Sequence, residues 1–111
     1  MAKVSDICKI ANAKLICGDP ERDFSGVYVG DLLSRAMSRV EENNVWITIM
    51  ANANVVAVAT LTEPAAVILA EGVVIADEAL EGAMKNGITV LSSPHTAYEL
   101  CLMLDELSSG K

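Results

Sequence analysis

The sequence predicts a single α/β domain over residues 1–111, a three-layer structure in which helices flank a mainly parallel sheet of four or five strands. Two observations support this prediction. Short apolar runs without in–out alternation recur along the chain, and strands covered on both faces have this pattern. Segments with apolar residues at helical spacing lie between these runs, and strand alternating with helix is typical of a parallel sheet.

Four apolar runs predict the main strands, and a fifth, weaker run predicts one more. The four cover residues 27–29, 45–49, 66–69 and 88–91, and the weaker one covers residues 14–17. Because these runs are continuous rather than alternating, we expect helices on both faces of the sheet.

Helical spacing of apolar residues predicts helices around residues 4–11, 33–40, 80–84 and 97–107. Three local signals mark their ends. Asp31 is placed to cap the second helix, and Gly87 is placed to end the third. Ser93 and Pro94 supply the N-cap and the first residue expected for the last helix.

Residues 54–62 allow two interpretations. Their Val and Thr residues favour a strand, whereas Asn52 or Asn54 as N-cap and Pro64 beyond the end favour a short helix. We expect a helix, because the strands on either side need a crossover connection to run parallel. A helix that is apolar nearly all round must be covered on more than one side, which predicts a homo-oligomer, most simply a two-fold dimer. Val58 would then lie either in the core or at that interface.

The acidic composition disfavours several classes of partner. A net charge of −7 without a Lys/Arg cluster disfavours nucleic acid and anionic membranes. No apolar run approaches the roughly 20 residues of a membrane span, and the first residues lack the apolar core of a secretory signal, so we expect a cytoplasmic protein. Three cysteines without a Cys-x-x-Cys spacing are expected to be small apolar residues, with a redox or metal role as the alternative: Cys8, Cys17 and Cys101.

No motif predicts catalysis. The chain has no P-loop, no dinucleotide-binding fingerprint and no Gly-x-Ser-x-Gly elbow. His95 is the only histidine, which excludes His-dependent triads and multi-His metal sites. Asp31, Glu71 and His95 could serve acid–base roles, but nothing in the sequence pairs them. We therefore expect no catalytic residues, no metal site and no cofactor.

Polar residues and glycines follow the predicted strands at the edge where α/β sheets bind ligands. The candidate ligand-binding residues are Gly30, Asp31, Asn52, Asn54, Glu71, Gly72, Ser92, Ser93, His95 and Thr96. Their amides and hydroxyls both donate and accept hydrogen bonds, and the two carboxylates favour a neutral, cationic or metal-bridged ligand over a bare phosphate. The alternative is that Asp31, Asn54 and Ser93 cap helices, the glycines form turns and His95 is solvated or locally bonded. Residues 21–23 are expected to form a solvated loop.

Residues 26–34, 45–49, 66–72 and 87–92, taken in order, resemble a DRTGG domain, and the resemblance spans nearly the whole chain. It extends to the N-terminal domain of HPr kinase/phosphorylase, in which phosphoryl transfer belongs to a separate P-loop domain. The resemblance implies a stand-alone, non-catalytic regulatory domain that binds a ligand. The alternative is a protein–protein interaction module, or a small subunit of a larger assembly, without a small-molecule ligand.

The family's signature residues are altered in this chain. Residues 51–54 read Ala-Asn-Ala-Asn where the family has its Asp-Arg pair, and residues 70–72 read Ala-Glu-Gly where it has Thr-Gly-Gly. Losing the arginine removes the obvious anion clamp, and Glu71 adds a negative charge at the same edge. A phosphate-bearing ligand is therefore not the one we expect.

Overall fold

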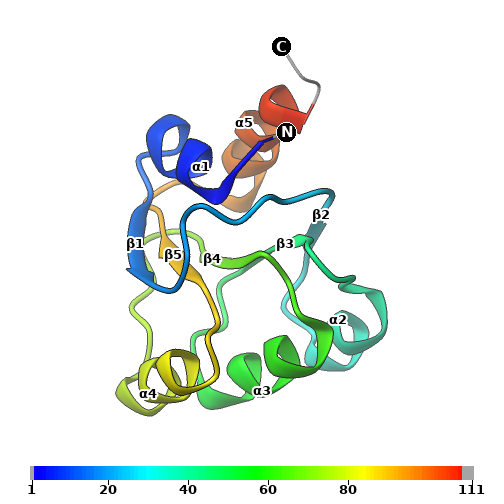
Figure 1. Cartoon of the computed structure of the whole chain (residues 1–111), viewed down its shortest axis with the longest axis vertical. Helices are drawn as coiled ribbons and strands as arrows, with labels where there is room; N and C mark the ends of the chain where they lie inside the picture. Colours follow the sequence, from blue (N-terminus) through cyan, green and yellow to red (C-terminus); the bar gives the residue numbers. More distant parts are fainter. Residues whose placement is uncertain (1, 109–111) are drawn as a thin grey trace.

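The computed structural model describes residues 2–108, which form three layers around one five-stranded sheet (Figure 1). The strand order is β1-β5-β4-β3-β2. β1 runs antiparallel to β5, and the other neighbours are parallel. The strands are β1 (Lys14–Cys17), β2 (Val27–Val29), β3 (Val45–Thr48), β4 (Ala66–Leu69) and β5 (Val90–Ser92). The predicted α/β class and mainly parallel sheet are confirmed.

Helices cover both faces of the sheet, as Figure 1 shows. The helices α1 (Val4–Ile10) and α5 (Ala97–Ser108) lie on one face. The helices α2 (Leu33–Arg39), α3 (Ala53–Thr62) and α4 (Asp77–Lys85) lie on the other. Every residue of the central strands β3 and β4 is buried, which explains why their sequences do not alternate.

Alternate residues of the central strands divide the core into two clusters. Ile47 and Ile68 pack beneath α1 and α5, whereas Trp46, Val67 and Leu69 pack beneath α2, α3 and α4. This division follows from the strand geometry, in which successive side chains point to opposite faces.

The ambiguous segment forms the helix α3, as predicted, and Asn52 is its N-cap. The Asn52 side chain accepts a hydrogen bond from the Asn54 N–H at 3.1 Å, so Asn54 as N-cap was wrong. Val58 is only 5% exposed and belongs to the core, whereas Leu61 on the same helix is 70% exposed. The sheet and the neighbouring helices α2 and α4 therefore cover α3 on more than one side. The apolar character of α3 does not require a second subunit to cover it.

Two strand boundaries differ from those predicted, and one helix end agrees with its prediction. The strand β3 ends at Thr48, because the Ile49 N–H bonds the Asp31 carboxylate instead of continuing the ladder. The strand β5 begins only at Val90. Gly87 ends α4 as predicted, with a φ of 68° that an L-residue adopts only with strain.

The loop between β1 and β2 is exposed at Glu21 and Asp23, as expected for residues 21–23, but it is tied to the body of the protein through Arg22. Arg22 is half-buried, and its guanidinium donates to Asn43 Oδ1 at 2.9 Å and to the Glu63 carbonyl at 3.2 Å. Asn43 and Glu63 have positive φ values at the turns that precede β3 and β4. Arg22 thus joins three connections at the amino-terminal edge of the parallel strands.

Candidate binding site at the carboxyl edge of the sheet

Four loops meet where the parallel strands end, and together we call them the carboxyl rim. They are residues 30–32, 49–54, 70–76 and 92–96, which follow β2, β3, β4 and β5. All ten predicted site residues belong to this rim. The fold brings them to one edge because the carboxyl ends of parallel strands lie side by side.

Asp31 joins the loops after β2 and β3. Its Oδ1 accepts hydrogen bonds from the Thr48 hydroxyl at 2.7 Å and from the Ile49 N–H at 2.9 Å. The N-cap position of α2 is Leu32, which makes no side-chain cap. The cap predicted for Asp31 was therefore wrong, and this carboxylate instead holds the end of β3.

Gly30 is fixed to β3 through its backbone. Its N–H donates to the Ile47 carbonyl at 3.1 Å, and its carbonyl accepts from Trp46 Nε1 at 3.0 Å. A Cβ at Gly30 would approach the ring of Tyr28 to 3.0 Å, so a larger residue requires the ring to shift. Because Gly30 has no side chain, the indole of Trp46 and the ring of Tyr28 can both pack against this turn.

Glu71 and Gly72 join the loop after β4 to the loop after β5. The Glu71 N–H donates to the His95 carbonyl at 2.8 Å, and the Gly72 N–H donates to the Ser93 carbonyl at 2.9 Å. Both residues have positive φ values, 58° and 70°. Glycine suits both positions, so Glu71 holds a backbone conformation that is strained for a residue with a side chain.

A further backbone bond connects the two central loops. The Ala76 N–H donates to the Ala51 carbonyl at 3.0 Å and so joins the loop after β4 to the loop after β3. Each of the four loops is thereby hydrogen-bonded to its neighbour along the sheet. The rim is a continuous, ordered surface rather than four separate loops.

Ser93 does not cap α5, and Pro94 is not its first residue. Ser93 is buried, and its hydroxyl donates to the Ala11 carbonyl at 2.9 Å. The helix begins at Ala97, where Thr96 and Glu99 bond each other reciprocally. Glu99 Oε1 accepts from the Thr96 N–H at 2.9 Å, and Thr96 Oγ1 accepts from the Glu99 N–H at 3.2 Å. The Thr-x-x-Glu spacing is the sequence signal for this capping box, and it was missed.

His95 lies beside the same carboxylate, with its Nδ1 3.4 Å from Glu99 Oε1. The hydrogen bond from the Thr96 N–H lowers the pKa of the Glu99 carboxyl, and the His95 ring contributes in the same direction. Glu99 therefore keeps a negative charge next to the rim. His95 is half-buried and bonded to a residue one helical turn away, as in the locally bonded alternative.

Three predicted site residues differ in how accessible their side chains are to a ligand. The Asn52 amide is engaged in capping α3, whereas the exposed Asn54 side chain makes no hydrogen bond to any described residue. Ser92 is half-buried at the end of β5. Asn54 is therefore the amide that a ligand can reach without breaking an existing bond.

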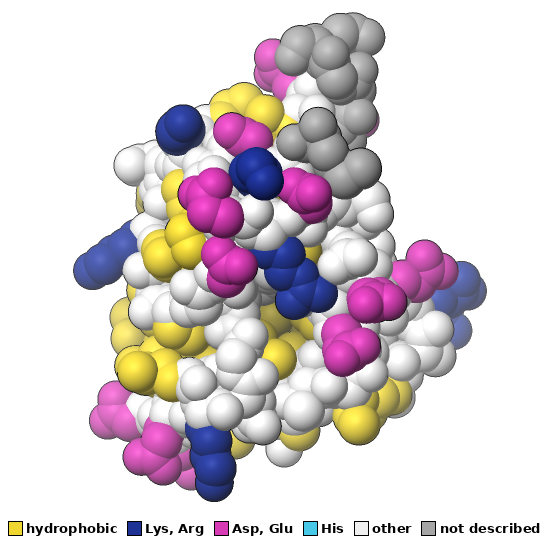
Figure 2. Space-filling view, in the orientation of Figure 1, with side chains coloured by type: hydrophobic (Ala, Val, Ile, Leu, Met, Phe, Trp, Pro, Cys, Tyr) yellow, Lys and Arg dark blue, Asp and Glu magenta, His cyan; other side chains and the backbone are white. Residues whose placement is uncertain are grey.

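The rim is acidic and partly apolar. It contains Asp31 and Glu71 and has no Lys or Arg. On the face shown in Figure 2, by contrast, Lys and Arg side chains lie among Asp and Glu. The rim also exposes Leu32 and Val74, which are 64% and 85% exposed. A carboxylate–apolar surface of this kind repels phosphates and attracts cationic or neutral groups.

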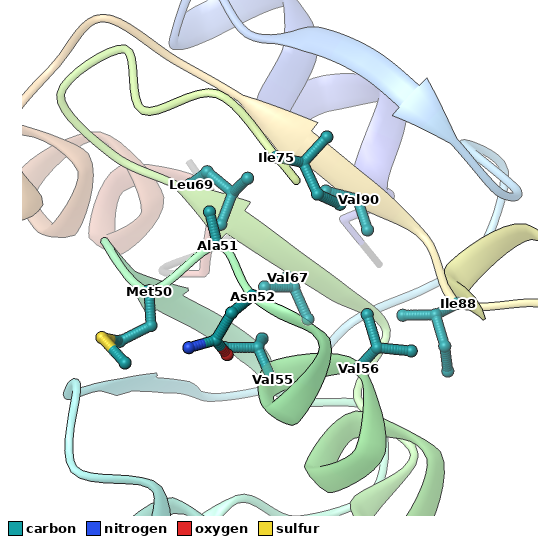
Figure 3. Close-up of a pocket in the computed structure, with 10 residues that line it drawn as sticks. All are labelled: Met50, Ala51, Asn52, Val55, Val56, Val67, Leu69, Ile75, Ile88 and Val90. Atoms are coloured by element: carbon teal, nitrogen blue, oxygen red, sulfur yellow. The ribbon is translucent and has the colours of Figure 1, made fainter. Parts of the chain in front are cut away.

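A small cavity lies just beneath the rim (Figure 3). Its volume is about 10 Å³, which is the room that one water occupies by this measure. Rim residues and apolar core side chains line it, among them Ala51, Asn52, Val67 and Ile75. Larger hollows of about 340 and 370 Å³ lie at the opposite edge, beside Cys17 and Arg22. A ligand at the rim must therefore bind on its surface or open this cavity.

The cysteines have no feature of a reactive thiol. All three are half-buried and free, and Cys17 Sγ donates to the Ile88 carbonyl at 3.3 Å. Burial raises the pKa of the Cys8 and Cys17 thiols, which disfavours the nucleophilic thiolate.

Residues 6–107 match the DRTGG domain in a comparison with known protein families. The chain belongs to the DRTGG family. At the turn over residues 70–72, for which the sequence resemblance suggests the family's Thr-Gly-Gly, Glu71 and Gly72 have positive φ values. Glycine suits such a backbone at both positions, so Glu71 in this DRTGG domain holds a conformation that glycine adopts more easily.

The DRTGG domain is similar in structure to part of a regulatory region. The solved structure contains the CBS and DRTGG domains of the regulatory region of Clostridium perfringens pyrophosphatase, complexed with the activator diadenosine tetraphosphate. The TM-score is 0.77 at 21% sequence identity, and the match covers 91% of this chain and 45% of the other. At this identity the similarity shows the shared fold. No curated protein sequence matches the chain. None of the described helices is both long and apolar enough to span a membrane.

Proposed function

We propose that this DRTGG domain is a non-catalytic regulatory module that binds its effector on the carboxyl rim. The main support is the hydrogen-bonded continuity of the rim, from Asp31 through Ala51 and Ala76 to Glu71 and His95. A surface held in one arrangement binds without first ordering its loops, which preserves affinity. The complex of the Clostridium perfringens regulatory region with an activator agrees with a regulatory role for this fold.

The proposed effector is neutral or cationic. The family's arginine position carries an uncharged residue here, and Asp31 and Glu71 are not balanced by a basic side chain within the rim. Diadenosine tetraphosphate carries several negative charges, which such a rim repels. This chain is therefore proposed to bind a ligand different from that of the pyrophosphatase regulatory region.

Asn54 offers a direct test, because its side chain is free of intramolecular bonds. Asn54→Ala should leave the melting temperature unchanged and weaken the binding of a rim ligand. The matched control is Asn52→Ala, which removes the cap of α3 and should cost about 1 kcal/mol of stability. Binding is measured by NMR titration with a panel of neutral metabolites, polyamines and adenine nucleotides. Resonance shifts clustered beside Arg22, with none on the rim, would contradict the proposal.

A protein partner is the second candidate, and the exposed Leu32 and Val74 favour it. Exposed apolar side chains in a rim that also carries Asp31 and Glu71 fit a partner surface that is apolar and basic. Leu32→Ser and Val74→Ser should then abolish co-purification of that partner and leave small-molecule binding intact. If the same two changes weaken a metabolite instead, the small-molecule interpretation stands.

We propose three further properties for this chain. It self-associates, it is cytoplasmic, and it is related to the N-terminal domain of HPr kinase/phosphorylase. A dimer agrees with the exposure of large apolar side chains outside α3, including Val27, Val29 and Met37. The acidic composition and the free cysteines agree with a cytoplasmic protein. The absence of a P-loop agrees with a regulatory role rather than phosphoryl transfer.

A further inference from the structure

The strand β2 forms one edge of the sheet, and its outer side is open. It pairs with β3 on one side only, at the end of the strand order. Its side chains Val27 and Val29 are 37% and 44% exposed, although both are large and apolar. An edge strand with exposed apolar side chains is a template for pairing with another strand.

The backbone of β2 presents unused hydrogen-bonding groups at this edge. The bonds to β3 use Gly26 and Gly30, whose carbonyl and N–H pair with Val45 and Ile47 at 3.0 and 3.1 Å. In a ladder, alternate residues direct their N–H and C=O groups to opposite sides. Val27 and Val29 therefore direct theirs away from β3, where the described residues provide no partner.

The opposite edge of the sheet is protected, and β2 is not. The strand β1 begins with Lys14, and its pairing with β5 is irregular between Leu15 and Cys17. A lysine and an irregular register both hinder pairing with a further strand. Residues 25–30, which include β2, contain no charged residue and no proline.

The distribution of charge allows a second copy of the chain to approach the edge formed by β2. The chain carries a net charge of −7, so two copies repel each other over most orientations. Residues 25–30 offer an uncharged strip along which two copies can meet without opposing carboxylates. The strip is also self-complementary, because an antiparallel two-fold pair places the outward N–H of each strand opposite an outward C=O of the other.

We propose that two copies of this chain pair through β2 in an antiparallel, two-fold arrangement that extends the sheet across the dimer. Val27 of one copy lies opposite Val29 of the other, and Tyr28 lies on the two-fold axis. The two valines form apolar cross-strand pairs, which stabilise antiparallel strands. This inference rests on the proposed self-association and is independent of ligand binding at the rim.

Two variants test the pairing without disturbing the core. Val27→Lys places a charge at the edge, as Lys14 does on β1. Val29→Pro removes an outward N–H, and proline is tolerated where an edge strand's N–H faces solvent. The control is Leu61→Lys, which adds the same charge to an exposed position on α3. Sedimentation equilibrium over a range of concentrations measures the dimer dissociation constant, and circular dichroism confirms folding.

Wild-type protein and Leu61→Lys should be dimeric. The dissociation constant of Val27→Lys and of Val29→Pro should rise about 100-fold or more, since an interface that buries an unpaired charge or loses its backbone bonds is strongly weakened. Variants that remain as dimeric as wild type overturn pairing through β2 while self-association stands. A monomeric wild-type protein overturns both the self-association and the pairing through β2. The NMR titration of the rim still tests the ligand proposal separately.

Amide hydrogen exchange supplies a measurement that does not depend on a variant folding. In the dimer, the Val27 and Val29 amides should be protected, and they should lose that protection on dilution. The Tyr28 amide faces β3 and should stay protected at every concentration. Fast exchange at Val27 and Val29 in a sample shown to be dimeric would rule out β2 as the interface.

Discussion

Asp31, in the loop after β2, accepts a 2.7 Å hydrogen bond from the hydroxyl of Thr48, the last residue of the neighbouring strand β3. The same carboxylate oxygen accepts the Ile49 N–H at 2.9 Å. Asp31 thus ends β3 and fixes the turn toward α3. A residue expected to cap its own helix instead organises the adjacent strand.

Asp31→Ala is expected to destabilise the protein by about 2 kcal/mol, because it leaves the buried Thr48 hydroxyl and the Ile49 N–H without their charged acceptor. Asp31→Asn keeps an acceptor oxygen and should cost clearly less. Urea unfolding of both variants measures the difference. Equal losses for Ala and Asn would show that the charge, rather than the acceptor geometry, stabilises this turn.

Glu71→Gly is expected to stabilise the protein by about 0.5–1 kcal/mol, since glycine adopts the φ of 58° at this position without strain. The control is Glu71→Ala, which removes the carboxylate but keeps a Cβ in the left-handed conformation. Thermal unfolding of the three proteins should place Gly above both Glu and Ala. If Ala stabilises as much as Gly, charge repulsion and not backbone strain is relieved.

The sequence predicted the layers of this fold better than its contacts. Continuous apolar runs such as residues 66–69 identify strands covered on both faces, because that pattern depends only on burial. The strand–helix choice at α3 followed from connectivity. The caps were mispredicted because Asp31 and Ser93 bond to segments distant in sequence, Thr48 and Ala11. Local capping rules do not include such partners.

The position of the candidate site was predictable for the same reason, and its internal bonds were not. Parallel strands bring their carboxyl ends to one edge whatever their side chains. The bonds of Glu71 and Gly72 to the loop after β5 depend on two consecutive positive φ values, which Glu71 does not signal in the sequence. The Thr96–Glu99 capping box was visible in the sequence and was overlooked in favour of Ser93 and Pro94.

Val58→Glu is expected to unfold the protein, because Val58 lies in the core between the sheet and the helices. A buried unpaired carboxylate is among the most costly single substitutions. Leu61→Glu, on the exposed side of the same helix, should stay folded. Circular dichroism distinguishes the two variants, and a folded, monomeric Val58→Glu would instead place α3 at a subunit interface.

Glu99 should make part of the stability depend on pH. Its folded-state pKa is lowered, so its contribution is fully present above the unfolded pKa and is lost as pH falls through the folded pKa. Glu99→Gln keeps an acceptor for the Thr96 N–H and does not titrate. The melting temperature of wild type relative to Glu99→Gln should therefore fall between neutral pH and pH values below 4.5, the ordinary pKa of a glutamate side chain. A constant difference between the two proteins would contradict this assignment.

Gly18 and Gly72 should respond very differently to alanine, although both have positive φ values of 102° and 70°. A Cβ at Gly18 would lie 2.3 Å from the backbone Cα of Thr89, whereas a Cβ at Gly72 would meet no atom within 4 Å. Gly72→Ala should cost about 1 kcal/mol, the strain of a left-handed alanine. Gly18→Ala adds a backbone clash and should cost about 3 kcal/mol or more, because the loop must move away from Thr89 and the Asp19 N–H must leave Thr89 Oγ1. Urea unfolding checks the order, and a smaller loss for Gly18→Ala than for Gly72→Ala would show that this loop yields to the added methyl group.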